Sequence, residues 1–166
     1  MLANVLLDTD RRRDLAATVG APILGTFIMV AWDLCLDPGQ STFAKAWIWE
    51  RGGGYFGVPL VNYLGWYLTV FLFLMAFSLY DARRIAASPL LSKSHWYQAS
   101  AFYGLMALDF GAGYLSGLGG AVTDATGKVW QMRDLLETAA IMGLFVMLPF
   151  AIASFVKVLL RDRPDA

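Results

Sequence analysis

Residues 57–80 read GVPLVNYLGWYLTVFLFLMAFSLY, and no side chain in this stretch carries a charge at neutral pH. An α-helix rises about 1.5 Å per residue, so about 20 apolar residues cross the roughly 30 Å of hydrocarbon in a bilayer. A helix on the surface of a soluble protein would instead carry charged residues along one face. The stretch therefore predicts a transmembrane helix.

Three further apolar stretches flank this one along the chain. The first is uncharged over residues 15–32, another is interrupted only by Asp109, and the last contains Pro149. A proline kink is tolerated where neighbouring helices of a bundle surround it. We therefore predict an all-α integral membrane bundle of about four transmembrane helices, forming a single transmembrane domain over residues 1–166. The helices are expected at approximately 15–36, 57–80, 96–118 and 135–158.

The composition excludes several classes of protein. Hydrophobic residues make up 58% of the chain and charged residues only 16%, which is outside the range of soluble globular domains. Thirteen basic residues balance thirteen acidic ones, so no basic surface is expected for a nucleic-acid partner. His95 is the only histidine and Cys35 the only cysteine, which excludes a histidine-based zinc or di-iron centre and an internal disulfide. We expect neither a metal nor another cofactor.

Lysines and arginines predict the orientation, because cytoplasmic loops of membrane proteins carry an excess of them. The amino terminus, the second connection and the carboxyl end hold nine, whereas the first and third connections hold four. We therefore expect both termini in the cytoplasm and the chain in the cytoplasmic (inner) membrane as a multi-pass protein. The nine are Arg11, Arg12, Arg13, Arg83, Arg84, Lys93, Lys157, Arg161 and Arg163, and the four are Lys45, Arg51, Lys128 and Arg133.

The first outer connection, residues 38–56, is rich in aromatic side chains. Amphipathic rings such as those of Trp47, Trp49 and Tyr55 settle at the interface between membrane and water. These three residues either anchor an interfacial segment or line a pocket for an apolar molecule. We assign them, with Trp66 of the next helix, as candidate substrate-binding residues.

Acidic and amide side chains gather in the outer half of the predicted bundle. Asp33 and Asp37 lie one turn apart on the same face of their helix, and Asn62 lies in the outer turns of the next one. Asp109 is placed roughly 20 Å from the inner boundary of its helix, and Glu137 is placed where the last helix begins from outside. An ionisable group in hydrocarbon costs several kcal/mol, so such residues are candidates for function.

Structural alternatives stay open for three of these residues. Asp109 could hydrogen-bond a neighbouring helix, Asp37 could end its helix before Pro38, and Glu137 could interact with a helix dipole. The candidate catalytic residues are Asp33, Asp37, Asp109 and Asn62, and Glu137 joins the candidate substrate-binding residues.

Removal from water favours the neutral form of a carboxyl group. A neutral carboxyl group can protonate an alkene, aromatic faces can stabilise the resulting carbocation, and a water molecule can trap it. Together these parts would make a cofactor-free hydratase. With an internal alkene in place of water, the same parts would make a cyclase.

The order of these residues resembles that of a known family. Residues 32–38 read WDLCLDP, residues 47–49 read WIW, and residues 53–66 read GGYFGVPLVNYLGW. The family pattern is D-x-x-L-D-P, then W-x-W, then G-x-Y-[FY]-G-V-P-x-x-N-x-x-G-W, and every element is present in order. The chain is thus similar to the carotenoid hydratases of carotenoid biosynthesis, among them bisanhydrobacterioruberin hydratase and the γ-carotene and lycopene 1,2-hydratases.

The resemblance implies hydration of the terminal double bond of an acyclic carotenoid, giving a tertiary alcohol without a redox cofactor. It implies a carotenoid or another long isoprenoid as the bound molecule. Asp33, Asp37 and Asn62 are motif positions, whereas Asp109 and Glu137 are assigned from depth alone. Family members carry several spans before D-x-x-L-D-P, and here 32 residues precede Asp33. We therefore expect a chain shortened at its amino terminus that forms a homo-oligomer or joins a partner membrane subunit.

Two other functions stay open. A shortened relative could serve as a non-catalytic structural or pigment-contacting subunit of a larger membrane assembly, such as a photosynthetic complex. A proton-coupled transporter that uses Asp109 fits less well, because the acids gather in the outer half instead of forming a relay across the membrane.

Overall fold

The computed structural model describes residues 1–9, 14–83 and 93–160 of the chain. Its elements are helix α1 (Leu2–Leu7), helix α2 (Leu15–Pro38) with its π-helical continuation η1 (Gly39–Phe43), α3 (Leu60–Ala82), α4 (Lys93–Leu115), strands β1 (Ala121–Thr123) and β2 (Val129–Gln131), and a last continuous helix made of α5 (Met132–Met142), the π-helix η2 (Gly143–Met147) and α6 (Leu148–Leu160).

The predicted all-α membrane bundle is confirmed. Among the described residues, three helical segments are long and apolar enough to cross a membrane: Leu15–Phe43, Leu60–Ala82 and Met132–Leu160. Helix α4 occupies the third predicted span and has the same length as α3, 23 residues. It is less apolar than the other three and is not among them, so the described chain has three clear spans and a fourth long helix beside them.

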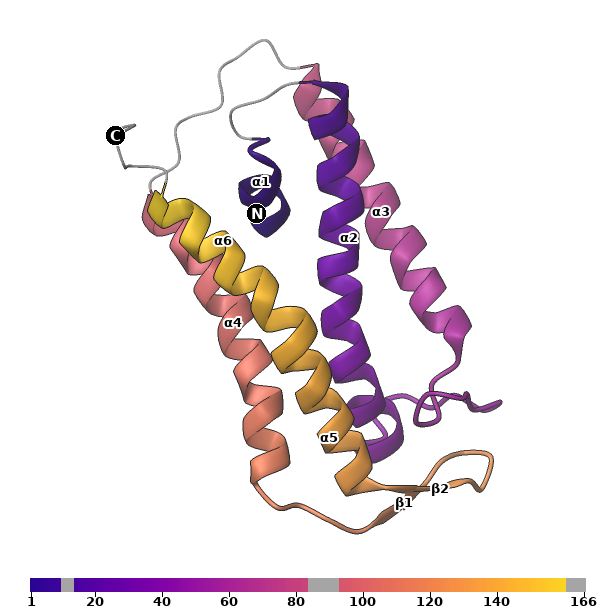
Figure 1. Ribbon diagram of the computed structural model, residues 1–166. Helices are drawn as coiled ribbons and strands as arrows, with labels where there is room; N and C mark the ends of the chain where they lie inside the picture. Colours follow the sequence, from indigo (N-terminus) through magenta and orange to yellow (C-terminus); the bar gives the residue numbers. More distant parts are fainter. Residues whose placement is uncertain (10–13, 84–92, 161–166) are drawn as a thin grey trace.

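The helices form two pairs with a short helix between them (Figure 1). Helix α2 packs along α3, and α4 packs along the last helix, which also contacts α2. The short helix α1 lies between α2 and α6. At the opposite end of the bundle, β1 and β2 form an antiparallel hairpin in which Ala121 pairs with Gln131. The sequence did not predict this hairpin, whose strands have three residues each.

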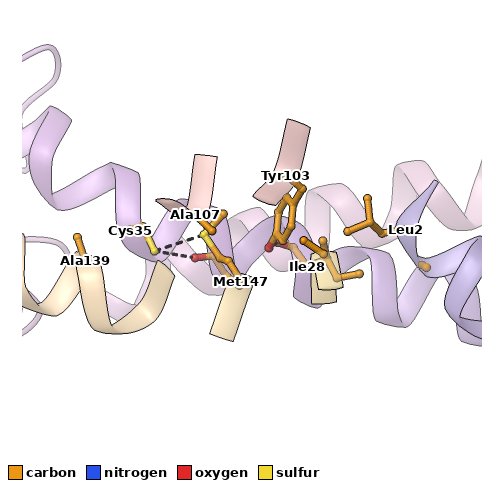
Figure 2. Close-up of a cluster of buried hydrophobic side chains, with 10 residues drawn as sticks. Leu2, Ile28, Cys35, Tyr103, Ala107, Ala139 and Met147 are labelled. Atoms are coloured by element: carbon orange, nitrogen blue, oxygen red, sulfur yellow. Dashed lines mark hydrogen bonds between the residues drawn. The ribbon is translucent and has the colours of Figure 1, made fainter. Parts of the chain in front are cut away.

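The core joins the two helix pairs through small and flexible side chains. The Cys35 Sγ of α2 lies 3.6 Å from the Met147 Sδ of η2, and Ala107 of α4 packs beside them (Figure 2). Further along the core, the Tyr103 hydroxyl donates a 2.6 Å hydrogen bond to the carbonyl oxygen of Ile28. This bond ties α4 to α2 and satisfies a buried hydroxyl.

Two prolines in α2 each leave one backbone carbonyl without its usual helical donor, because proline has no N–H. For Pro22 the carbonyl four residues back is that of Thr18, and the Ser78 hydroxyl of α3 donates to it at 2.7 Å. For Pro38 it is the Leu34 carbonyl. In an apolar environment such groups need partners from neighbouring elements, and α3 supplies the first of them.

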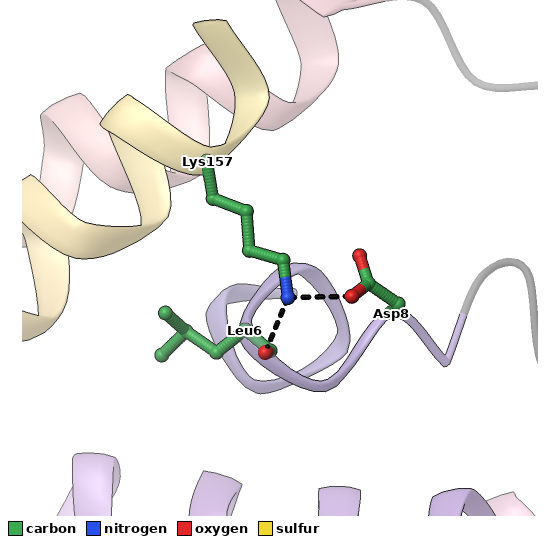
Figure 3. A network of polar contacts seen from close by, with 3 residues as sticks. All are labelled: Leu6, Asp8 and Lys157. Carbon is green, nitrogen blue, oxygen red and sulfur yellow. Dashed lines mark hydrogen bonds and ion pairs between the residues drawn. The ribbon is translucent and has the colours of Figure 1, made fainter. Parts of the chain in front are cut away.

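Lys157 of α6 links that helix to α1. The Lys157 Nζ lies 2.6 Å from Asp8 Oδ2 and donates a 2.7 Å hydrogen bond to the Leu6 carbonyl oxygen (Figure 3). The carbonyl belongs to the last turn of α1, where a positive charge is favourable. Of the basic residues used to predict orientation, Arg11, Arg12, Arg13, Arg84, Arg161 and Arg163 lie outside the described residues.

Candidate functional site

The connection before α3 folds back on itself and so positions the start of that helix. The backbones of Tyr55 and Val58 exchange hydrogen bonds of 3.3 and 2.9 Å. A Cβ atom on Gly53 would lie 2.1 Å from the Val58 carbonyl, and Gly57 has a φ of 85°, so glycine is required at both positions. The turn explains why Gly53 and Gly57 stand on either side of Tyr55 and Phe56 in the sequence. It directs the first turn of α3 towards α2.

Asp37 is the point at which the sequence motifs meet. Its side chain is 1% exposed, and its Oδ1 accepts a 2.8 Å hydrogen bond from Trp47 Nε1. Its Oδ2 accepts a hydrogen bond from Asn62 Nδ2 in the first turn of α3. Two donors on one carboxyl group stabilise its charged form. The structure thus brings together three residues that lie up to 25 positions apart in sequence.

Asp33 lies one turn before Asp37 on α2 and borders an apolar groove. The groove has a volume of about 170 Å³ and is lined by α2 and by one residue of α3. An engineered cavity of about 150 Å³ accepts benzene, so a space of this size accommodates a small branched hydrocarbon group. The lining residues are Met29, Val30, Trp32, Asp33, Leu36 and Trp66.

A smaller cavity lies between the π-helical end of α2, the aromatic connection and the β-hairpin. It has a volume of about 80 Å³ and is bordered by Trp49, by Lys45 and by Asp124 of the connection between the strands. The Trp49 ring is therefore in this second cavity and is not a lining residue of the groove at Asp33. Its remaining lining residues are Ser41, Thr42, Ile48, Gly57, Thr123 and Ala125.

The hairpin is held together by Asp124. Its Oδ1 accepts hydrogen bonds from the backbone and the hydroxyl of Thr126 and from the backbone of Lys128, and its Oδ2 accepts one of 2.8 Å from Trp130 Nε1. Slight desolvation opposes ionisation of Asp124, but the hydrogen bonds from Thr126 and Trp130 outweigh it and lower its pKa to about 2. The Trp130 ring also contacts Phe56, which couples the hairpin to the turn before α3.

Four buried polar side-chain atoms have no hydrogen-bond partner within the described part of the chain: Trp32 Nε1, Asp33 Oδ2, Trp49 Nε1 and Tyr63 OH. Native proteins leave few such atoms, and each calls for an explanation. Asp33, which is 9% exposed, forms no ion pair among the described residues either. A carboxyl group in apolar surroundings with a free oxygen is suited to the neutral form.

The rings of Tyr55 and Tyr63 meet edge to face beside the Asp33 and Asp37 pair, with ring centroids 5.8 Å apart. The Tyr55 hydroxyl is already engaged, because it donates to the Leu34 carbonyl oxygen. Its burial raises the pKa of Tyr55 to about 12. The Tyr55 hydroxyl therefore links the aromatic connection to α2, and a role of Tyr55 as a substrate-binding residue rests on its ring alone.

Asp109 and Glu137 are not brought to the site. Both side chains are exposed on their helices, and neither forms a hydrogen bond or ion pair with Asp33 or Asp37 in the described structure. Asp109 lies on the face of α4 away from Tyr103 and Ala107, which pack into the core. Glu137 lies inside α5 and not at its start, since that helix begins at Met132 and carries Asp134 in its first turn.

The assembled residues offer two carboxyl groups in different surroundings, one held by two donors and one facing an apolar groove. Such a pair suits proton transfer to and from an apolar molecule, with one group as acid and the other as base. Sequence reasoning missed Trp32 and Tyr63, whose roles depend on packing. Among the described residues, no group of three or more histidine, cysteine, aspartate or glutamate side chains is placed to hold a metal ion.

Comparison with known proteins adds one finding. Residues 1–126 match the model of a family described as carotenoid biosynthesis protein. The matched part includes α2, α3 and α4 with the whole of the Asp33 and Asp37 site, and it ends in the turn of the hairpin. No curated protein and no solved structure matches the chain.

Proposed function

The chain belongs to the carotenoid biosynthesis protein family, and from this premise we propose that it hydrates the terminal double bond of an acyclic carotenoid without a cofactor. The proposal rests on two neighbouring carboxyl groups with different surroundings. Asp33 borders an apolar groove, and its Oδ2 has no hydrogen-bond partner among the described residues. Asp37 accepts hydrogen bonds from Trp47 and Asn62. Acid-catalysed addition of water to an alkene needs one group that gives a proton and one that accepts it.

In the proposed reaction Asp33 is the acid. Its proton is added to the CH carbon of a terminal (CH₃)₂C=CH– group, which leaves a tertiary cation on the carbon that bears the methyl groups. Electron-rich indole faces at the groove, those of Trp32 and Trp66, stabilise this cation. A water oxygen then forms the new C–O bond, and the oxygen loses one proton to the Asp37 carboxylate. Return of that proton to Asp33 completes the cycle, so that one alkene and one water give one tertiary alcohol.

Trp47 and Asn62 are positioning residues in this scheme. Their N–H groups hold both oxygens of Asp37, which favours its carboxylate form and orients it towards α3. Asp109 and Glu137 are given no part in the reaction, because the described structure does not join them to the two carboxyl groups.

The groove lies on the surface shared by α2 and α3, two segments apolar enough to cross a membrane. A carotenoid dissolved in the bilayer would reach Asp33 sideways, with its end group in the groove and its chain in lipid. The proposal places the protein in the cytoplasmic membrane, in contact with a long isoprenoid, as a homo-oligomer or with a partner membrane subunit.

Pigment analysis tests the proposal. The chain would be expressed in bacterial cells that accumulate lycopene, and the extracted pigments separated and identified by mass. We expect a product heavier than lycopene by one water, with loss of this product in Asp33→Asn. Asp134→Asn, which removes an exposed acid in the first turn of α5, is the matched control and keeps the product.

Absence of the hydrated pigment from cells that contain the folded wild-type protein would contradict the hydratase proposal. Purification in mild detergent then separates the alternatives. A chain that carries unmodified carotenoid, or that elutes with a second membrane protein, would favour a pigment-contacting subunit. A chain that gives the alcohol while eluting at twice its own mass would favour the enzyme as a homodimer.

A further inference from the structure

Tyr63 is the most deeply buried polar side chain of α3, and its hydroxyl has no hydrogen-bond partner within the described residues. The residue is 6% exposed. A buried hydroxyl without a partner lowers stability, so native proteins retain one where it binds something or takes part in chemistry. The family-like sequence pattern leaves position 63 unspecified, so no motif singles out this tyrosine.

The surroundings of this hydroxyl are those of the proposed reaction. Tyr63 follows Asn62, whose amide holds Asp37. On the facing helix α2, Asp33 Oδ2 and Trp32 Nε1 are the buried polar atoms without a partner among the described residues. The ring of Tyr63 packs against that of Tyr55, whose hydroxyl donates its hydrogen to the carbonyl oxygen of Leu34, the residue after Asp33. The Tyr55 hydroxyl therefore has no hydrogen left to donate to Asp33 or Asp37.

We propose that the Tyr63 hydroxyl positions the water molecule that adds to the carbocation, between the Asp33 and Asp37 carboxyl groups. This inference rests on the proposed hydration and assigns its water site. A phenol can accept a hydrogen bond from water and donate one at the same time, which fixes where the water oxygen points. In the proposed step the Asp37 carboxylate accepts the other water proton in a hydrogen bond and takes up that proton when the C–O bond forms.

Tyr63 does not take part in the first step. Asp33 protonates the alkene in either case, and a cation that is not trapped loses a proton from a neighbouring carbon and returns to alkene. In D₂O the proton that is added is a deuteron, so a reversal in which the cation loses a proton in place of that deuteron leaves deuterium in the recovered alkene. Trapping by positioned water and reversal by proton loss are therefore two measurable fates of one cation.

The experiment uses purified full-length protein in lipid nanodiscs that contain lycopene, in D₂O. For wild type we expect mostly alcohol and little deuterium in the remaining lycopene. In Tyr63→Phe we expect the alcohol to fall by about 10²-fold, as misplacement of a reacting group does, while deuterium in recovered lycopene rises. Because the lost hydroxyl has no partner, the midpoint of thermal unfolding should stay the same or increase.

Two matched variants serve as controls for Tyr63→Phe. Tyr67→Phe removes a hydroxyl one turn further along α3 and should match wild type in both measurements. Tyr55→Phe removes a hydroxyl with a structural partner, so alcohol and deuterium should fall together. The inference is overturned if Tyr63→Phe changes both signals in parallel, or if it makes alcohol at the wild-type rate. Wild type that yields neither alcohol nor deuterium would instead overturn the hydratase proposal itself.

Discussion

The hydroxyl of Tyr55 donates a 3.1 Å hydrogen bond to the carbonyl oxygen of Leu34. Leu34 is four residues before Pro38, so no backbone N–H of α2 is available for that carbonyl. The side chain of a loop residue thus replaces one bond of the helix. It does so within one turn of Asp37, and it fixes the aromatic connection against the end of α2.

A double-mutant cycle on Tyr55 and Pro38 should show strong coupling. Tyr55→Phe leaves the Leu34 carbonyl without a donor and should lower the free energy of unfolding by about 1–3 kcal/mol. In Pro38→Ala the backbone gains an N–H for the same carbonyl, so the cost of Tyr55→Phe should shrink. Unfolding in detergent, followed by circular dichroism, gives the four values. Equal costs in both backgrounds would show that the hydroxyl does not replace the missing helical bond.

The two carboxyl groups should differ in their contribution to stability. In Asp37→Asn an amide N–H₂ replaces one carboxylate oxygen, so the N–H group of Trp47 or of Asn62 faces a donor where it needs an acceptor. This substitution should lower the free energy of unfolding by about 1–3 kcal/mol. Asp33→Asn removes no hydrogen bond found in the described structure and should leave that free energy nearly unchanged. Thermal unfolding of both variants checks this. If Asp33→Asn lowered the free energy of unfolding more than Asp37→Asn does, the proposed difference between the hydrogen-bonded Asp37 and the unpartnered Asp33 would be contradicted.

The hairpin should loosen in acid. The pKa of Asp124 is lowered from 3.8 to about 2 in the folded chain, so its hydrogen bonds contribute fully above pH 3.8 and are lost as the pH falls through about 2. The indole N–H resonance of Trp130, assigned by its loss in Trp130→Phe, should shift across this window because its acceptor is Asp124. Asp124→Asn should abolish the transition. A resonance that is constant down to pH 2 would exclude Asp124 as the titrating acceptor.

Lys157 should control the docking of α1 more than the stability of the bundle. Its ion pair with Asp8 is about one-third exposed, and exposed pairs contribute about 0–1 kcal/mol. Lys157→Met should therefore change the midpoint of unfolding little, while hydrogen exchange of the α1 amides increases. Asp8→Asn keeps the bond from Lys157 to the Leu6 carbonyl and should have a smaller effect on exchange. Equal exchange in wild type and Lys157→Met would refute this role.

Much of the bundle could be predicted because each long helix contains an uncharged or nearly uncharged run. The uncharged run that begins at residue 15 becomes α2, with Asp14 accepting a hydrogen bond from the Ala17 N–H at its start. The third span was predicted at 96–118, but α4 begins at Lys93 and ends at Leu115. The hairpin between residues 121 and 131 has few apolar residues in alternation, so its pairing could not be read from the sequence.

The site was only partly predictable, because depth along a helix does not determine the direction of a side chain. Asp33 and Asp37 are separated by one turn, so their shared face follows from helical geometry. For Asp109 the direction is set by which residues of α4 pack inward, and Tyr103 and Ala107 take that place. Tyr63 could not be found from sequence at all, since only packing shows that its hydroxyl is buried without a partner.

The groove beside Asp33 lies on α2 and α3, two segments apolar enough to cross a membrane, which affects how the proposed reaction must be measured. A molecule that arrives through the membrane is diluted by lipid and not by water. The rate should then follow the mole fraction of carotenoid in the bilayer, and adding carotenoid-free lipid at constant total substrate should slow it. Membrane composition would in this way act on the chain as directly as the amount of substrate does.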